Sequence, residues 1–179
     1  MQKPENKKRI FFALWPEDEV REKLIKTFNS SGFSKQTGQK FKPENLHLTL
    51  HFLGNVSAQK YTCVMNAAEK LTFNSFELVL NKFDVFQKAK IFYMGMTDTP
   101  QGLVVLQSRL GEVLSGCDFQ PESRIFTPHV TLVRKIKSFT IENVADEINW
   151  QVKRFALVES LPAEGGVEYR PVKFFKSRL

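Results

Sequence analysis

The sequence lacks the marks of several common protein classes. Its 179 residues contain only two cysteines and three histidines, and no apolar run approaches the roughly 20 residues that span a bilayer. It has no Gly-rich loop ending in Lys-Ser/Thr, no GxGxxG after a strand and no GxSxG, so nothing indicates a phosphate loop, a dinucleotide site or an α/β-hydrolase nucleophile. No linker or low-complexity tract divides the chain, and we expect one domain over residues 1–179 and no membrane association.

The scarcity of cysteine bears on the cellular compartment. Cys63 and Cys117 are far apart in the chain and form no CxxC pair, which predicts two reduced thiols. Residues 1–9 are polar, and the apolar piece that follows is too short for a signal peptide. We therefore expect a cytoplasmic protein.

Hydrophobic residues and positive charge are plentiful. Hydrophobic residues make up 42% of the chain, including 17 phenylalanines, which is enough for a packed core and argues against disorder. The net charge is +7 and the pI about 9.4, which favours a polyanionic partner, most commonly nucleic acid. A generally basic soluble protein would show the same charge, so charge alone does not establish nucleic-acid binding.

The order of the expected elements is mixed. Alternating or continuous apolar runs predict strands, and apolar stripes at helical spacing predict helices. The strands are expected at residues 9–14, 46–53, 76–83, 91–96, 126–133, 152–160 and 167–175, and the helices at 16–28, 57–71, 99–116 and 141–148. Hairpins rather than a regular strand–helix alternation connect them, which predicts an α+β fold.

A repeated His-x-Thr pattern is the main functional signal. In the strand around residue 48, His47 and Thr49 share one face while the neighbouring leucines share the other. His129 and Thr131 repeat this arrangement about half the chain later. Two of the three histidines thus lie in equivalent settings, and we expect the two copies to face each other in one site.

These residue types suit proton transfer at a phosphate. A neutral histidine can take a proton from a nucleophile while a charged one gives a proton to the leaving oxygen. A threonine hydroxyl two residues away can donate to a phosphate oxygen. Arg124 and Arg134 lie five residues either side of His129, and either could contact the anion. No metal or other cofactor is needed for this chemistry.

The third histidine leaves alternatives open. In a continuous strand His51 shares the face of His47 and Thr49, but the strand could also bulge before Gly54. A solvated or structural role for His51 is the favoured interpretation. Three histidines could also bind a catalytic zinc, although no HExxH or CxxC is present and the two threonines would then have no role.

The flanks of both patterns resemble a known family. Residues 43–54 (PENLHLTLHFLG) and 124–134 (RIFTPHVTLVR) resemble the two HxTx motifs of the 2H phosphoesterases. The most similar branch is the RNA 2′,3′-cyclic phosphodiesterases, formerly called 2′-5′ RNA ligases (LigT-like, ThpR). Residues 9–14 and 165–172 look like the opening strand and closing hairpin of that family, so the resemblance covers nearly the whole chain.

The resemblance implies a fold and a reaction. The fold would have two pseudo-symmetric lobes, with antiparallel sheets facing a central cleft and helices outside. The reaction would be metal-independent hydrolysis of terminal RNA 2′,3′-cyclic phosphate to a 2′-phosphomonoester. By resemblance, His47 would be the proton donor and His129 the proton acceptor, while Thr49, Thr131 and Arg134 would bind the phosphate.

Substrate choice is less determined. Phe52 matches an apolar family position that could stack on the terminal base, and His51 departs from the family pattern. The same residues would serve a 2′,5′-oligonucleotide phosphodiesterase or a 2′-5′ RNA ligase. A non-catalytic RNA-binding module is a further alternative, and no obligate protein partner is indicated.

Overall fold

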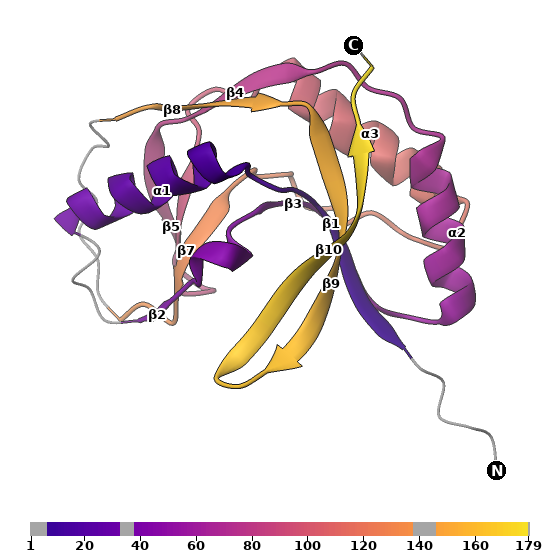
Figure 1. The fold of residues 1–179 in the computed structure, drawn as a ribbon, viewed down its shortest axis with the longest axis horizontal. Coiled ribbons are helices and arrows are strands. Elements are labelled where there is room, and N and C mark those ends of the chain that lie inside the picture. Colours follow the sequence, from indigo (N-terminus) through magenta and orange to yellow (C-terminus); the bar gives the residue numbers. More distant parts are fainter. Residues whose placement is uncertain (1–6, 33–37, 138–145, 179) are drawn as a thin grey trace.

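The computed structural model describes residues 7–32, 38–137 and 146–178, and their fold is α+β, as the sequence predicted (Figure 1). The strands are β1 (Lys8–Leu14), β2 (Gln39–Lys40), β3 (Leu48–Val56), β4 (Phe76–Leu80), β5 (Lys82–Phe86), β6 (Ile91–Gly95), β7 (Val130–Arg134), β8 (Ile148–Val152), β9 (Arg154–Ala163) and β10 (Gly166–Lys176). The α-helices are α1 (Asp18–Ser30), α2 (Ala58–Glu69) and α3 (Gln101–Ser115), and Pro43–Asn45 forms a short 3-10 helix. None of the helices described here is long and apolar enough to cross a membrane.

One antiparallel sheet contains most of the strands. Its order is β10-β9-β1-β3-β7-β6-β5, and β2 pairs with β7. The two halves of this sheet meet where β3 and β7 pair through Leu48 and Val130. The sheets that the resemblance assigns to separate lobes are therefore joined into one sheet. Strands β4 and β8 form a second, two-stranded sheet.

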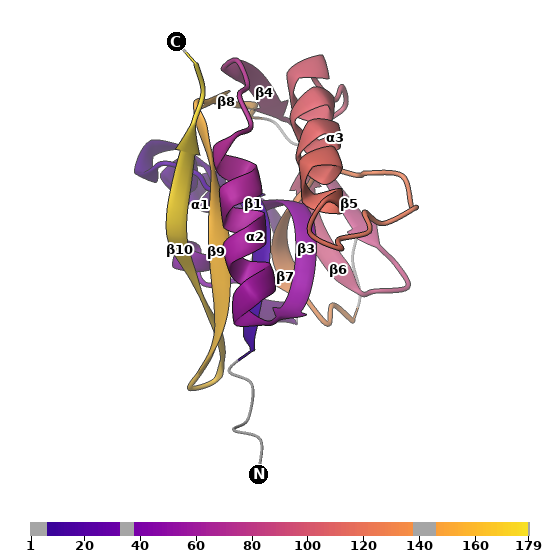
Figure 2. The ribbon, with the colours of Figure 1, turned by 90° about the vertical axis from the view of Figure 1, so that its right-hand side faces the viewer.

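The two faces of the large sheet have different surroundings. All three helices contribute buried side chains to one core cluster, together with Phe12, Leu48 and Val130 of the sheet. On the other face Phe11, Ala13 and Trp15 belong to a smaller cluster that includes residues of β9. Figure 1 shows α1 towards one end of the sheet and α2 and α3 towards the other, and Figure 2 shows α2 and α3 side by side. The face without helices is thus left open for a site.

Local sequence signals explain most element boundaries. Ser57 caps α2 by accepting a hydrogen bond from the backbone N–H of Lys60, and Pro100 and Gly116 flank α3. The expected strand 76–83 is instead divided into β4, which pairs with β8, and β5, which pairs with β6. Of the expected helix 141–148, residues 141–145 lie outside the described residues, and Ile148 begins β8, so the helical prediction is wrong at that end.

The prediction of two reduced thiols is wrong in this structure. Cys63 of α2 and Cys117, just beyond α3, form a disulfide with their Cα atoms 5.8 Å apart. Helices α2 and α3 pack against each other, which brings Cys63 and Cys117 to bonding distance. A pattern search for CxxC cannot detect such a pair, because the proximity arises only from the tertiary packing of α2 and α3.

Replacing both cysteines by serine should lower the free energy of unfolding by about 2–4 kcal/mol. The bridge closes a 54-residue separation, which restricts the unfolded chain more than the folded one. Urea unfolding of the double variant, with and without reductant, measures the loss. Wild-type protein treated with reductant is the matched control and should unfold like the variant. Equal stability of oxidised wild type and variant would contradict the expectation.

Candidate active site

The two His-x-Thr patterns meet at the junction between the halves of the sheet. β3 and β7 are antiparallel and pair at Leu48 and Val130, whose side chains are buried in the helix-side core. The antiparallel direction brings His47 opposite Thr131 and Thr49 opposite His129. The four side chains therefore share the open face, and both histidines lie one residue before the observed strand starts.

His47 is held by its backbone and by aromatic rings. Its Nδ1 is 2.6 Å from the carbonyl oxygen of Asn45, and its Nε2 is 3.1 Å from Oγ1 of Thr49. Because a carbonyl only accepts hydrogen bonds, the Nδ1 atom carries the proton and donates it. Trp15 stacks on the imidazole with 10° between the planes, and Tyr169 meets it edge-on at 89°. In the neutral ring Nε2 is then an acceptor, and the Thr49 hydroxyl donates to it.

His129 repeats the backbone part of this arrangement. Its Nδ1 is 2.7 Å from the carbonyl oxygen of Thr127, so the same tautomer is selected. Phe86 contacts the ring edge-on with centroids 4.8 Å apart, and Tyr93 lies 5.1 Å away. In both motifs the carbonyl two residues earlier binds Nδ1, which leaves Nε2 available for proton transfer.

Both histidines have lowered pKa values. Burial lowers the pKa of His47 to about 4, the bond to Asn45 opposes this shift, and positive charge on His129 and Arg134 adds to it. Burial also lowers the pKa of His129, and the bond to Thr127 opposes that shift. Arg124 and Arg134 add to the lowering at His129. At neutral pH and without an anion, both imidazoles are therefore mainly neutral.

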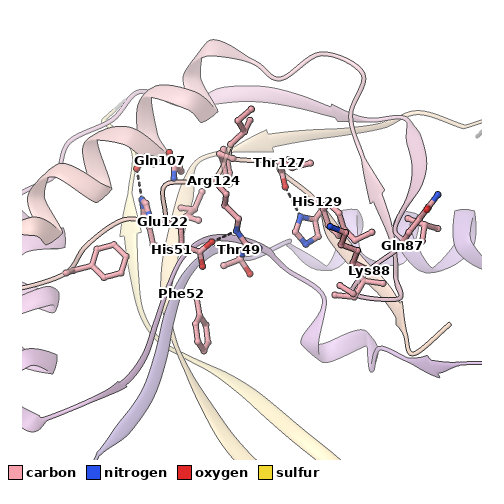
Figure 3. A pocket seen from close by; sticks show the side chains of 18 residues that line it. Thr49, His51, Phe52, Gln87, Lys88, Gln107, Glu122, Arg124, Thr127 and His129 are labelled. Atoms are coloured by element: carbon pink, nitrogen blue, oxygen red, sulfur yellow. Dashed lines mark hydrogen bonds and ion pairs between the residues drawn. The ribbon is translucent and has the colours of Figure 1, made fainter.

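A bulge in β3 answers the open question about His51. Along the pairing of β3 with β1, Thr49 is opposite Ala13, whereas His51 is opposite Phe12, and the register shifts between them. The bulge turns His51 towards the helix-side core and Phe52 towards the open face, where Phe52 lies near Phe11. Figure 3 shows the two side chains pointing in opposite directions. His51 therefore does not share the face of His47.

His51 instead connects β3 to α3. Its Nε2 is 2.7 Å from the carbonyl oxygen of Gln107, and its ring meets Phe119 edge-on at 5.4 Å. The ring also packs closely on Gly111, where an added Cβ would lie 3.2 Å from the imidazole. Burial lowers the pKa of His51, while the bond to Gln107 and the charge of Glu122 oppose this. These contacts support the structural interpretation of His51.

Replacing His51 with alanine should lower the free energy of unfolding by about 1–3 kcal/mol, because the partly buried Gln107 carbonyl loses the imidazole donor and a cavity forms beneath α3. Thermal or urea unfolding measures this loss. Unchanged stability in His51→Ala would contradict the structural role.

A cavity lies beside His129, between β3, the turn that joins β5 to β6, and residues 122–129. Its volume is about 630 Å³, which suits a nucleotide-sized ligand. Thr49, Phe52, Arg124 and His129 line it, together with exposed Ile125 (Figure 3). The remaining predicted site residues, His47, Thr131 and Arg134, lie outside this lining. The cavity therefore borders the His-x-Thr residues on the side of His129.

The two arginines differ in their surroundings. Arg134 lies at the exposed end of β7 with its guanidinium 5.1 Å from the centre of the Phe41 ring, and its charge acts on both histidines. Arg124 is exposed at the rim of the cavity and forms an ion pair with Glu122. The geometry thus brings Arg134 close to the histidine pair. Arg124, in contrast, would have to release Glu122 before it could bind a phosphate.

The arrangement does not support a three-histidine zinc site. Among residues 7–32, 38–137 and 146–178, no three His, Cys, Asp or Glu side chains are grouped so that they could hold a metal ion. The bulge directs His51 away from the face on which His47 and His129 lie. The donors that the zinc alternative requires are therefore not brought together.

Comparison with known proteins agrees with these motifs. The sequence profile of the 2′-5′ RNA ligase superfamily matches residues 16–163. The chain belongs to this superfamily, which is a family of enzymes. An RNA 2′,3′-cyclic phosphodiesterase of Escherichia coli (strain K12) is 34% identical over 168 residues, covering 92% of this chain and 94% of that one. A relative of the same name from Thermotoga maritima is 29% identical and covers 90% and 91%.

Solved structures of the superfamily share the fold. The crystal structure of E. coli LigT complexed with 3′-AMP has a TM-score of 0.89 and 30% identity, covering 97% of this chain and 100% of that chain. LigT in apo form gives a TM-score of 0.88. The predicted LigT-like fold and family membership are thus confirmed.

Part of the surroundings of His47 was not predicted from the sequence. Asn45, Trp15 and Tyr169 contact its imidazole from three separate segments. Trp15 does follow Phe11 and Ala13 at a period of two, which could have put it on the same face of β1. The contact of Tyr169 had no such signal, because it depends on how the closing hairpin packs over the motif.

Proposed function

We propose that this protein is a metal-independent RNA 2′,3′-cyclic phosphodiesterase that produces a 2′-phosphomonoester. Water attacks the phosphorus, His129 takes the proton of that water, and His47 gives a proton to the departing 3′ oxygen. The P–O3′ bond breaks, leaving a 3′-hydroxyl and a 2′-phosphate. This sequence of transfers uses one base and one acid and balances without a cofactor.

One observation carries the proposal. Both histidines donate Nδ1–H to the backbone carbonyl two residues earlier, at 2.6 Å and 2.7 Å, on antiparallel motifs that meet at Leu48 and Val130. Each therefore offers Nε2 to the same open face. A cyclic phosphate between them would meet one nitrogen on the side of the attacking water and the other on the side of the leaving oxygen.

The remaining residues have supporting roles in this proposal. Thr49 and Thr131 donate to the non-bridging phosphate oxygens, and Arg134 supplies fixed positive charge. An anion at this point also raises the pKa of His47, which a general acid requires. The 3.1 Å contact between Thr49 Oγ1 and His47 Nε2 supports a shared position for acid and phosphate.

The terminal nucleoside occupies the adjoining cavity in this proposal. Phe52 is 43% exposed on the open face, which suits stacking on a base. Arg9 lies over the Phe52 ring at 4.9 Å and adds positive charge beside it. Arg124 at the rim is a second candidate contact for the RNA backbone. Together these groups favour an RNA end over a small phosphate ester.

Product analysis tests the proposal. A short RNA with a terminal 2′,3′-cyclic phosphate is incubated with the protein in excess EDTA, and the product phosphate is assigned by 31P NMR against 2′- and 3′-phosphate standards. The 2′-phosphate is expected, and the His47→Ala/His129→Ala double variant is the matched control. Loss of activity in EDTA that zinc restores would overturn the metal-independent mechanism.

The alternatives correspond to other outcomes of the same assay. Cleavage of a 2′,5′-linked dinucleotide in preference to the cyclic-ended RNA would favour an oligonucleotide phosphodiesterase. Joining of two RNA ends would favour ligation. Tight RNA binding by the double variant, with no turnover by wild type, would favour a non-catalytic binding module.

We also propose that the protein acts in the cytoplasm, since its substrate class is RNA. The Cys63–Cys117 disulfide is unusual for that compartment. Fractionation of cells that express the protein, with alkylation of free thiols before lysis, tests both points. Recovery in an oxidising extracytoplasmic fraction would overturn this localisation.

A further inference from the structure

Asn45 connects the first motif to the closing hairpin. It is the last residue of the 3-10 helix Pro43–Asn45 and is only 6% exposed. Its Nδ2 donates to the carbonyl oxygen of Val167 at 2.9 Å, and its Oδ1 accepts from the backbone N–H of Tyr169 at 2.9 Å. Both partners belong to β10, so the two ends of the amide are bound to the backbone of a strand far away in the sequence.

The same residue also holds His47 through its backbone. Its carbonyl oxygen accepts the Nδ1–H of His47 at 2.6 Å. Tyr169, whose N–H is bound by the Asn45 side chain, packs its ring edge-on against the His47 ring at 5.1 Å. The side chain and the carbonyl of Asn45 therefore act on one assembly, made of β10, the 3-10 helix and the imidazole.

In the second motif, the residue whose carbonyl binds the histidine is not buried. Thr127, whose carbonyl binds Nδ1 of His129, is exposed, whereas Asn45 is buried. An amide buried in this way has to keep both of its hydrogen bonds, because losing either leaves a desolvated polar group. The carbonyl that orients His47 is thereby fixed more strongly than the carbonyl that orients His129.

We propose that Asn45 is a positioning residue for the reaction, which fastens the 3-10 helix to β10 so that its carbonyl keeps His47 in the Nδ1–H tautomer with Nε2 towards Thr49. The role rests on the proposed function of His47. Asn45 does not act on the phosphate itself: its side chain is committed to β10 and its carbonyl to the imidazole. Its effect on the reaction passes entirely through His47.

Kinetics and imidazole NMR of Asn45→Ala test this role. Displacement of a reacting group by about 1 Å can cost about 10²-fold, so kcat should fall by up to that factor while KM for the cyclic-ended RNA stays unchanged. Two-bond 15N–1H spectra should show His47 as Nδ1–H in wild type and partly as Nε2–H in the variant. Its pKa should also fall, because the Asn45 carbonyl stabilises the charged ring.

Other charged groups near His47 are constant in this comparison. His129 and Arg134 act on its charge and the Tyr169 ring packs on it, and none of these three residues is substituted in the variant. Glu44→Ala is the matched control, since Glu44 is the exposed neighbour in the same 3-10 helix. It should leave kcat and the His47 spectrum as in wild type.

A second variant covers the case in which Asn45→Ala does not fold. Asn45→Asp keeps the shape and the acceptor for Tyr169 but loses the donor to Val167, so kcat and the His47 tautomer should change in the same direction to a smaller extent. The added carboxylate raises the pKa of His47, so the pKa comparison is made with Asn45→Ala alone. If kcat falls only with the folded fraction while His47 keeps its tautomer and pKa, Asn45 has a purely structural role and the inference is wrong. Absence of cyclic phosphate hydrolysis in wild type would instead count against the proposed function. The NMR comparison would still show whether Asn45 controls the tautomer of His47.

Discussion

His47→Ala and His129→Ala should each slow hydrolysis of a 2′,3′-cyclic-ended RNA by about 10²–10⁴-fold, because each removes one of the two proton-transfer groups. The loss should appear in kcat rather than in KM, since the threonines and Arg134 still bind the phosphate. Steady-state kinetics under saturating RNA separate the two parameters. Retention of more than about a tenth of the wild-type kcat in either variant would be inconsistent with an acid–base pair of this kind.

The controls for this prediction follow from the packing around each ring. His47 lies between Trp15 and Tyr169, so removing its ring leaves space among aromatic side chains and reduces stability. Each variant should therefore be assayed well below its melting temperature, with circular dichroism to confirm folding. The double variant should lose little more than the worse single variant, because an acid and a base that act in one step are not additive.

Part of this site could be predicted from the sequence, for a clear physical reason. The period of two within a strand assigns His47 and Thr49 to one face, and His129 and Thr131 to one face, without any tertiary information. The pairing of Leu48 with Val130 is different, because it joins two halves of the chain and depends on the complete fold. The resemblance to the family implied that the two motifs face each other across a cleft, but it did not supply this strand pairing.

The features that escaped prediction all depend on distant segments. The bulge that separates Thr49 from His51 is visible only in the pairing of β3 with β1, and a period of two predicts the wrong face for His51 if the strand is taken as continuous. The Cys63–Cys117 bridge follows from the packing of α2 on α3. The bonds of Asn45 to β10 likewise join positions more than 120 residues apart.

The pKa values of the two histidines should determine how the rate of hydrolysis depends on pH. His47 has to be charged and His129 neutral, yet the ligand-free pKa of His47 is about 4 and that of His129 is below its usual value. Above both pKa values, the fraction of molecules with His47 charged falls tenfold for each pH unit. Because kcat/KM reports the free protein, it should fall about 100-fold between pH 7 and pH 9.

The pH profile of kcat should differ from that of kcat/KM because the substrate is an anion. Bound phosphodiester offsets the positive charge of Arg134 and His129, which lower the pKa of His47 in the free protein. The alkaline limb of kcat should therefore lie at higher pH than that of kcat/KM, in the same buffers and at constant ionic strength. An Arg134→Met variant removes a charge that lowers both pKa values, so its kcat/KM limb should move to higher pH even though phosphate binding weakens. A kcat/KM that is flat from pH 7 to pH 9 would contradict His47 as the proton donor.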